Sequence, residues 1–366
     1  SSFKKIITFT VIKNLKQVKI YNLKNIFYFL MKYLLRYYNQ VFFREIKVYG
    51  YENIPPDGGV LFSPNHQGAF LDPLLVGSMT PRKITSLTRS DVFGGPLQWF
   101  LDAFQMLPVY RIRNGYGNLK KNDAIFEKCY KILGEGKFLL MFSEGGHHNE
   151  YFLQRLSKGS SRLAYNAQLE NPGKKIYLQP MGLNYGHHQQ VRCDLHIVYG
   201  KPIEVGKEID SNLSEAENIN KIREELQERM RDCLWLPDKT ENYQTQKERI
   251  NRLTTQLEFQ KLREVLDSNF ESLPVRRKLS TARNTFALLL TIPNLIPIWI
   301  TRKIIGKFKD VVFISSMKYA MGVFFFPVWW LLSSIPIAYS LGNRVMTIYL
   351  LICISSIFIR QRILLS

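Results

Sequence analysis

Residues Asn65–Asp72 place two side chains capable of acid–base chemistry directly after a short apolar run. His66 and Asp72 lie six positions apart, and Gly59–Phe62 precede them. This pattern is typical of a strand that delivers a histidine to the start of a helix. A carboxylate beside an imidazole fixes its tautomer and stabilises its charged form, so the pair could act as a general base without a side-chain nucleophile. A helix-capping histidine beside a solvated aspartate would show the same pattern.

Three later segments accompany this pair along the chain. They are Met106–Arg113, Phe138–Gly146 and the apolar run Ile176–Gly182. Together with Asn65–Asp72, and in this order, they resemble the four sequence blocks of the glycerolipid acyltransferase family. The resemblance covers about residues 45–205. No block is specific by itself, but the order of the four is.

The chain departs from the family's blocks at a few positions. The gap between His66 and Asp72 is one residue longer than is usual, as in some branches of the family. Gln105 stands where the second block usually has Gly, and Ser143 stands where the third usually has Pro. His147 follows in place of a residue that is commonly Arg, and it could line the acceptor pocket. The changes in the third block leave the identity of the acceptor open.

The resemblance implies roles for individual residues. His66 would be the general base and Asp72 would orient it, with no covalent enzyme intermediate. Arg111 would bind the phosphate of the acceptor, because a guanidinium matches phosphate geometry with two hydrogen bonds. Glu144 is anionic, so we expect it to orient an arginine or a glycerol hydroxyl. The candidate substrate-binding residues are Asn65, Arg111, Glu144, Gly145, Arg113 and Lys158.

The implied activity is that of a membrane-bound acyltransferase of phospholipid biosynthesis. It would transfer a fatty acyl group to glycerol-3-phosphate or 1-acylglycerol-3-phosphate. Acyl-CoA and acyl carrier protein both remain open as the donor, and no cofactor is expected beyond this co-substrate. Two alternatives remain: transfer to another lysolipid or to an amino-acid lipid, and a non-catalytic membrane protein that keeps the fold. Retention of His66 and Asp72 beside Arg111 argues against the second alternative.

Composition favours a membrane as the partner. The chain has 366 residues and a formal charge of +20, which suits an anionic membrane surface, and it lacks the motifs of a nucleic-acid-binding module. The cysteines are far apart and predict neither disulfides nor a zinc site; reduced thiols fit an enzyme that faces the cytoplasm. They are Cys129, Cys193, Cys233 and Cys353. The two His-His doublets lack a metal-binding motif, so no metal is expected.

The N-terminal segment, residues 1–44, contains no Asp or Glu and spaces lysines among aromatic and aliphatic residues. This predicts basic amphipathic helices that lie in a membrane interface. The repeated lysines do not match a cleavable signal peptide. A helix packed on the following domain is the alternative.

Residues 45–205 alternate short apolar runs with helical stretches. This predicts a layered α/β acyltransferase domain with a mixed sheet and flanking helices. We expect strands at 46–49, 60–63, 138–142, 176–182 and 195–199, and helices at 73–78, 97–103, 119–133 and 160–168.

Residues 206–281 are rich in charges of both signs and predict two solvated helices broken at Leu236-Pro237. An apolar stripe for packing is expected at Leu253, Leu257, Phe259, Leu262 and Leu266.

Residues 282–366 predict a membrane-embedded section with a transmembrane hairpin at 319–359. Tyr319–Leu341 is an uncharged run of 23 residues, long enough to span a bilayer, and Val345–Ile359 is the shorter return. Thr285–Thr301 contains two prolines and suggests a re-entrant or interfacial helix. Lys and Arg flank the hairpin, so the positive-inside rule places both of its ends, and the catalytic domain, on the cytoplasmic side. A buried hairpin of a soluble domain is the alternative.

Overall fold

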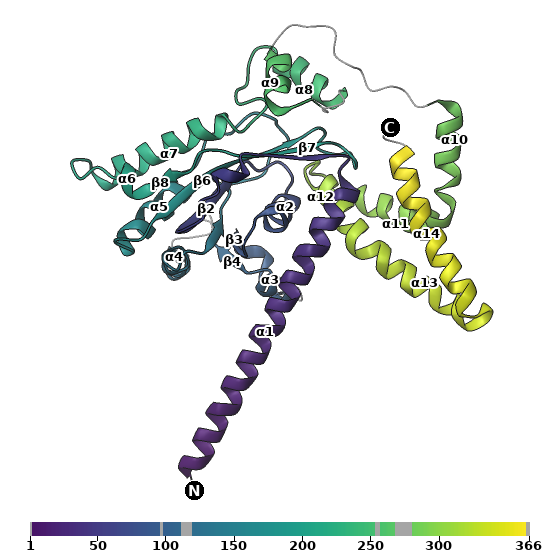
Figure 1. Ribbon diagram of the computed structural model, residues 1–366, viewed down its shortest axis with the longest axis horizontal. Helices are drawn as coiled ribbons and strands as arrows, with labels where there is room; N and C mark the ends of the chain where they lie inside the picture. The colour runs from purple at the N-terminus through teal and green to yellow at the C-terminus, as the bar shows by residue number, and fades with distance from the viewer. Residues whose placement is uncertain (1, 96–97, 111–118, 253–256, 268–279, 364–366) are drawn as a thin grey trace.

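A mixed β-sheet of eight strands lies at the centre of the protein (Figure 1). The computed structural model describes residues 2–95, 98–110, 119–252, 257–267 and 280–363. The order across the sheet is β1-β7-β6-β2-β5-β3-β4, and β8 pairs with β6. The strands are β1 Ile46–Tyr49, β2 Gly59–Pro64, β3 Ile84–Arg89, β4 Met106–Val109, β5 Phe138–Leu140, β6 Ile176–Tyr185, β7 Leu195–Tyr199 and β8 Ile203–Glu204.

Strand β2 occupies the middle of the sheet. It pairs in parallel with β5 on one side and with β6 on the other, and all its residues are buried. A strand covered on both faces is a continuous apolar run rather than an alternating one, which is how it stands out in the sequence. Strands β1 and β7 are parallel to each other, but β7 is antiparallel to β6, so the sheet is mixed as expected.

Helices cover both faces of the sheet and give the domain three layers. Val60 and Phe62 of β2 pack with Leu75 of α2 on one face, whereas Leu61 packs with Leu163 of α5 on the other. The helices of this part are α1 Ser2–Phe42, α2 Leu71–Met79, α3 Gln98–Ala103, α4 Leu119–Gly134, α5 Gly159–Glu170, α6 Val205–Glu208, α7 Glu215–Arg231, α8 Tyr243–Arg252 and α9 Phe259–Asp267, with short 3-10 turns η1 Tyr51–Asn53 and η2 Ser90–Val92.

The first helix, α1, is a single long element. From residue 22 onward it packs on α2 and α3, with Leu35 buried, while Ile26, Leu30 and Tyr37 are exposed on its other side. This part of α1 therefore packs on the α/β domain. Its exposed apolar side leaves the interfacial role a prediction.

In the described part of the charged segment, the short helix α6 is followed by three longer helices, α7 to α9, where two were expected. Helix α7 begins with a capping box, in which Ser214 and Glu217 each bond the other's backbone N–H. It is not a solvated helix, because Ile222, Leu226 and Met230 are buried against the sheet. The expected stripe is partly present, since Phe259, Leu262 and Leu266 are buried and Leu257 packs beside them, whereas Leu253 lies outside the described residues.

The C-terminal section contains two helices that are long and apolar enough to cross a membrane, at Phe313–Leu341 and Asn343–Ile363. The elements are α10 Thr281–Leu289, η5 Ile292–Asn294, α11 Leu295–Ile305, α12 Phe313–Ala320, the π-helical η6 Met321–Phe325, α13 Phe326–Leu341 and α14 Asn343–Ile363. A third crossing results only if α10 and the η5–α11 helix, bent by 47°, form one span.

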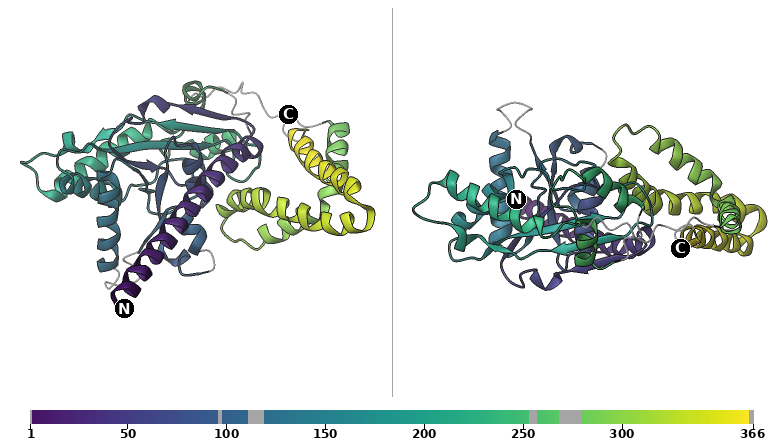
Figure 2. Two further views of the ribbon diagram at one scale, coloured as in Figure 1. Left: turned by 60° about the horizontal axis from the view of Figure 1, so that its bottom comes forward. Right: turned by 90° about the horizontal axis from the view of Figure 1, so that it is seen from above.

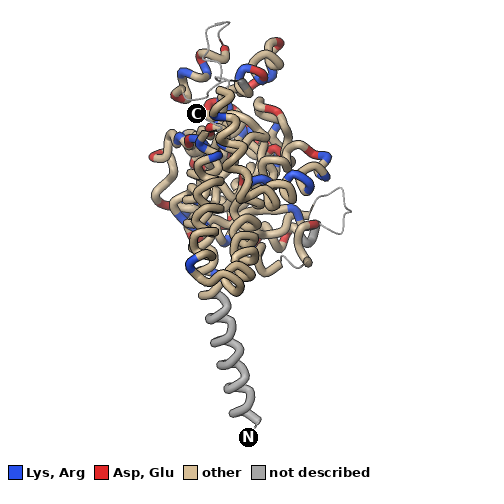
Figure 3. Tube along the Cα trace, turned by 90° about the vertical axis from the view of Figure 1, so that its right-hand side faces the viewer, with Lys and Arg blue, Asp and Glu red and all other residues tan. Residues whose placement is uncertain are grey.

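The expected hairpin at 319–359 falls within these two helices. Their connection passes through Gly342, whose φ of +84° suits glycine. Both helices lie to one side of the sheet (Figures 1 and 2), and charged residues are sparse along the helices that face the viewer in Figure 3. The first apolar helix of the hairpin starts at Phe313 rather than at 319, because the single charge of Lys318 does not interrupt it. The Lys318 amine donates to Gln189 O at 2.8 Å.

Candidate active site

The predicted histidine and aspartate meet at the carboxyl end of β2. The chain leaves the strand at Pro64, turns through Gly68, and enters α2 at Leu71, which puts Asp72 in the first turn of that helix. His66 Nδ1 lies 2.8 Å from Asp72 Oδ2. The carboxyl ends of parallel strands are where α/β sheets usually bind ligands, so this position suits a reactive pair.

The Asp72 carboxylate is fully buried and well supplied with donors. The backbone N–H groups of Gln67 and Gly68 donate to Oδ2 at 2.9 and 2.7 Å. The hydroxyl of Tyr185, at the end of β6, donates to Oδ1. These hydrogen bonds, together with the start of a helix, compensate the negative charge of the buried carboxylate.

Tyr185 was not predicted as part of the site. Burial, together with the charge of Asp72, raises the pKa of its hydroxyl well above the usual value, so it remains a proton donor to the carboxylate. The period of strand β6 places Met181, Leu183 and Tyr185 in the same core cluster. That alternation extends past the fourth sequence block and is the signal by which Tyr185 could have been found.

Asn65 supports the site from behind. Its side chain is fully buried, accepts from Leu183 N at 2.7 Å and donates to Leu183 O at 3.1 Å. The amide thus ties the end of β2 to β6 and uses both its oxygen and its nitrogen. The Asn65 side chain bonds β6 rather than an open site. Its predicted contact with substrate therefore stays a prediction.

Glu144 fixes the backbone of the histidine. Its buried carboxylate accepts from His66 N at 2.6 Å and from Gln154 N at 3.0 Å, and it lies 3.1 Å from His148 Nε2. The expected role of Glu144 in orienting an arginine or a glycerol hydroxyl stays a prediction. The next residue, Gly145, has a φ of +75°, so a residue with a side chain would strain the backbone there. The strain would come from this φ, since no atom lies close to the position of a Cβ.

The His66 ring stands between two other rings. It stacks on Phe142 with the centroids 3.9 Å apart, and His147 meets it edge-on at 5.6 Å. Within the described residues, His66 Nε2 has no hydrogen-bond partner, and the side chain is 15% exposed. This nitrogen is the one that a general base would offer to a substrate once Nδ1 is held by a carboxylate.

The other predicted binding residues have different outcomes. Arg111 and Arg113 lie outside the described residues. Lys158 is exposed just before α5, and the described structure shows no contact between it and His66. Gln105, in the position where the second block usually has Gly, has a φ of +57°, which explains the usual residue.

Ser143, which replaces the usual Pro, is buried with its hydroxyl between those of Ser63 and Ser160. All four cysteines lie within the described residues, where they are buried and form no disulfide. In the part of the chain that the structure describes, no three His, Cys, Asp or Glu side chains are grouped to hold a metal ion.

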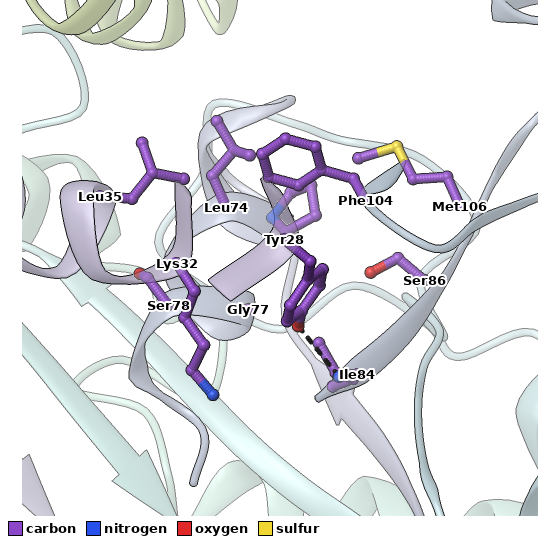
Figure 4. A pocket seen from close by; sticks show the side chains of 11 residues that line it. Tyr28, Lys32, Leu35, Leu74, Gly77, Ser78, Ile84, Ser86, Phe104 and Met106 are labelled. Carbon is purple, nitrogen blue, oxygen red and sulfur yellow. Dashed lines mark hydrogen bonds between the residues drawn. The ribbon is translucent and has the colours of Figure 1, made fainter. Parts of the chain in front are cut away.

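A small cavity lies behind α2, between this helix, α1, β3 and β4 (Figure 4). Its volume is about 20 Å³, room for about one water molecule, so it is not a preformed site for an acyl chain. Lys32 borders the cavity and donates to Thr80 O and Arg82 O at 2.7 and 3.0 Å. Burial, followed by repulsion from Arg36, lowers the pKa of Lys32 to about 8.

Comparisons with known proteins agree with the resemblance to glycerolipid acyltransferases seen in the sequence. Residues 45–184 match the model of the Acyltransferase family. Glycerol-3-phosphate O-acyltransferase 1 of Saccharomyces cerevisiae is 26% identical over 87 residues, which are 24% of this chain and 12% of that protein. Glycerol-3-phosphate O-acyltransferase 2 of the same yeast is 29% identical over 90 residues, 25% of this chain and 12% of that protein. The matched region therefore spans only about an eighth of these relatives.

Among solved structures, the 1-acyl-sn-glycerophosphate (LPA) acyltransferase PlsC from Thermotoga maritima is similar at a TM-score of 0.42 and 16% identity. The alignment covers 56% of this chain and 78% of that one.

Proposed function

We propose that the protein is a membrane-bound glycerolipid acyltransferase, because residues 45–184 match the model of the Acyltransferase family. It moves a fatty acyl group from a thioester to glycerol-3-phosphate or 1-acylglycerol-3-phosphate. The observation that carries the proposal is the His66–Asp72 pair, in which a buried carboxylate holds Nδ1 and leaves Nε2 without a hydrogen-bond partner among the described residues.

The proposed reaction needs only this pair as its chemical groups. The acceptor hydroxyl donates its proton to His66 Nε2 as its oxygen attacks the thioester carbonyl. Asp72 stabilises the imidazolium that forms. Collapse of the tetrahedral intermediate expels the thiolate, which takes the proton from His66, so that the histidine is neutral again. No acyl group is attached to the protein at any stage.

The acceptor's phosphate is proposed to bind Arg111, on the strength of the second sequence block. His147 lies beside the reactive ring and carries its own partner, since Nε2 is 3.0 Å from Asp310 Oδ2. A histidine in place of the usual arginine favours a second candidate function, transfer to a different lysolipid. The panel of acceptors described below separates the two.

The two apolar helices support a membrane-bound enzyme. We place both hairpin ends on the cytoplasmic side, because Lys307, Lys309 and Arg362 flank the hairpin. The exposed apolar side of α1 would then lie against the same leaflet, and anionic lipids would attract the basic chain. This orientation leaves both acyl-CoA and acyl carrier protein open as the donor.

Acyl transfer in isolated membranes tests the function. Membranes with the wild-type protein are given acyl-CoA or acyl-acyl carrier protein and a panel of acceptors: glycerol-3-phosphate, 1-acylglycerol-3-phosphate and phosphate-free lysolipids. We expect product with a phosphate-bearing acceptor and its loss in His66→Ala, since a general base contributes about 10²- to 10⁴-fold or more. Equal product from His66→Ala and wild type would refute the assignment. No product from any combination would favour the non-catalytic alternative.

A further inference from the structure

Ser316, in the first apolar helix of the C-terminal section, contacts the turn that joins His66 to Asp72. Leu71 N donates to Ser316 Oγ at 3.1 Å, and the Ser316 hydroxyl donates to Gly68 O. Ser316 is fully buried. It lies far outside residues 45–184, the region that matches the family model. A residue of the membrane section thus bonds the backbone on both sides of the catalytic turn.

The turn needs outside support because one of its residues is strained. Ala69 has a φ of +45°, a region that residues other than glycine avoid. The turn also closes on itself, since Leu71 N donates to Gly68 O at 2.9 Å. This is the place where the chain has one residue more than is usual between His66 and Asp72. Such a conformation persists only when its surroundings fix it, and Ser316 contacts both ends of the strained step.

The geometry of the turn determines that of the reactive pair. Gln67 N and Gly68 N donate to Asp72 Oδ2, which is also the oxygen that contacts His66 Nδ1. A rotation of the Gly68 peptide would therefore move the carboxylate relative to the ring.

Helix α12 is itself anchored to the α/β domain. The Tyr319 hydroxyl donates to Asn39 Oδ1 at 2.6 Å, and Asn39 Nδ2 in turn donates to Ser78 Oγ of α2 at 3.0 Å. On the preceding side, Phe313 meets the His147 ring edge-on at 5.1 Å. Ser316 is thus held in place by contacts on both sides of it along the helix.

We propose that Ser316 is a positioning residue for the His66–Asp72 pair. The active site is then complete only when α12, the start of the first apolar helix, is packed against the catalytic turn. The inference rests on the proposed acyltransferase function. It predicts that loss of the Ser316 hydroxyl slows turnover without weakening the binding of either substrate.

The test compares Ser316→Ala with Ser315→Ala in membranes that contain equal amounts of protein. Ser315 is the neighbouring buried serine, and among the described residues it makes no hydrogen bond to the catalytic turn. We expect kcat of Ser316→Ala to fall about tenfold to a hundredfold, as for the loss of two buried hydrogen bonds, with KM for donor and acceptor changed less than about twofold. Ser316→Thr keeps the hydroxyl and should recover most of the lost turnover.

The outcomes separate this inference from the proposed function. If His66→Ala is inactive while Ser316→Ala turns over like Ser315→Ala, the inference is wrong and the function stands. A rise in both KM values at unchanged kcat, or equal losses in the Ala and Thr variants, would also overturn it. If the wild-type protein transfers no acyl group, both fail. Should Ser316→Ala not accumulate, Ser316→Cys keeps the volume while weakening both hydrogen bonds, and the same comparison of kcat applies.

Discussion

Replacing Asp72 by asparagine should remove the charge of the reactive pair while keeping its hydrogen bonds. In the structure Oδ2 receives the N–H groups of Gln67 and Gly68 and contacts His66, and Oδ1 receives the Tyr185 hydroxyl. An amide can place its oxygen at the position of Oδ2. Its NH₂ group then donates to Tyr185, whose hydroxyl only has to rotate. The histidine keeps its tautomer, so the variant isolates the electrostatic contribution.

The expected loss follows from the charge that develops on His66 when it takes the acceptor's proton. Nδ1 and Oδ2 are 2.8 Å apart, which puts the centres of the two charges at roughly 4 Å. At an effective dielectric constant of about 20, such a pair is worth about 4 kcal/mol, or about 10³-fold in rate. The remaining amide dipole recovers part of this. We therefore expect kcat of Asp72→Asn to fall by about 10²- to 10³-fold, with both KM values nearly unchanged.

Steady-state acyl transfer in membranes measures this effect, and Tyr185→Phe is the matched control. The control removes one hydrogen bond to the same carboxylate but leaves its charge, so its loss of turnover should be smaller, at most about tenfold. Thermal unfolding of both variants checks that the fold is intact. The reasoning fails if Asp72→Asn retains more than about a third of wild-type turnover, or loses no more than Tyr185→Phe does.

Three further predictions concern binding, topology and stability. Arg111→Ala should raise KM about 10- to 100-fold for a phosphate-bearing acceptor and much less for the acyl donor; an equal rise for both would make Arg111 structural. A cysteine placed at Asn343 should react with an impermeant thiol reagent outside sealed cells, and one at Lys309 should not. The reverse pattern would contradict the topology with both hairpin ends on the cytoplasmic side. Burial lowers the pKa of His196 to about 4, below the value of about 6.5 expected in the unfolded chain, so the unfolded state binds the extra proton and stability falls as pH drops below about 6.5. From neutral pH to pH 5 this costs about 2 kcal/mol, and His196→Asn, which can still accept from Trp235 Nε1, should show a correspondingly smaller decrease in Tm; an unchanged decrease would refute the assignment.

The reactive pair could be predicted from the sequence because both residues lie in one short segment. The strand before them is a continuous apolar run, and the helix expected at 73–78 starts two residues earlier, at Leu71, so that Asp72 lies in its first turn. The residues that hold the pair could not be predicted this way. Tyr185 and Ser316 come from positions 113 and 248 residues away from their partners, and no local periodicity reports such contacts.

The strands of the sheet could be predicted less completely than the reactive pair. Strand β3, with the sequence Ile-Thr-Ser-Leu-Thr-Arg, has too few apolar residues to stand out, although it is paired on both sides. Strand β4 coincides with the start of the second sequence block, and its four residues are too few to predict a strand by themselves. Charges dominate the composition of helix α7 and predict a solvated helix, whereas its buried apolar residues Ile219, Ile222, Leu226 and Met230 occupy only a narrow stripe.

The anchoring of α12 has a mechanical consequence for an enzyme in a bilayer. The hydrogen bonds of Ser316 and Tyr319 join the base of the first apolar helix to the α/β domain, and the same helix runs on to Leu341. The domain therefore cannot swivel freely on its anchor. A bilayer thinner than the hairpin tilts the helices, and that tilt would be passed on to the domain, moving His66 relative to the lipid headgroups. Turnover would then vary with the acyl-chain length of the host lipids, independently of the chains being transferred.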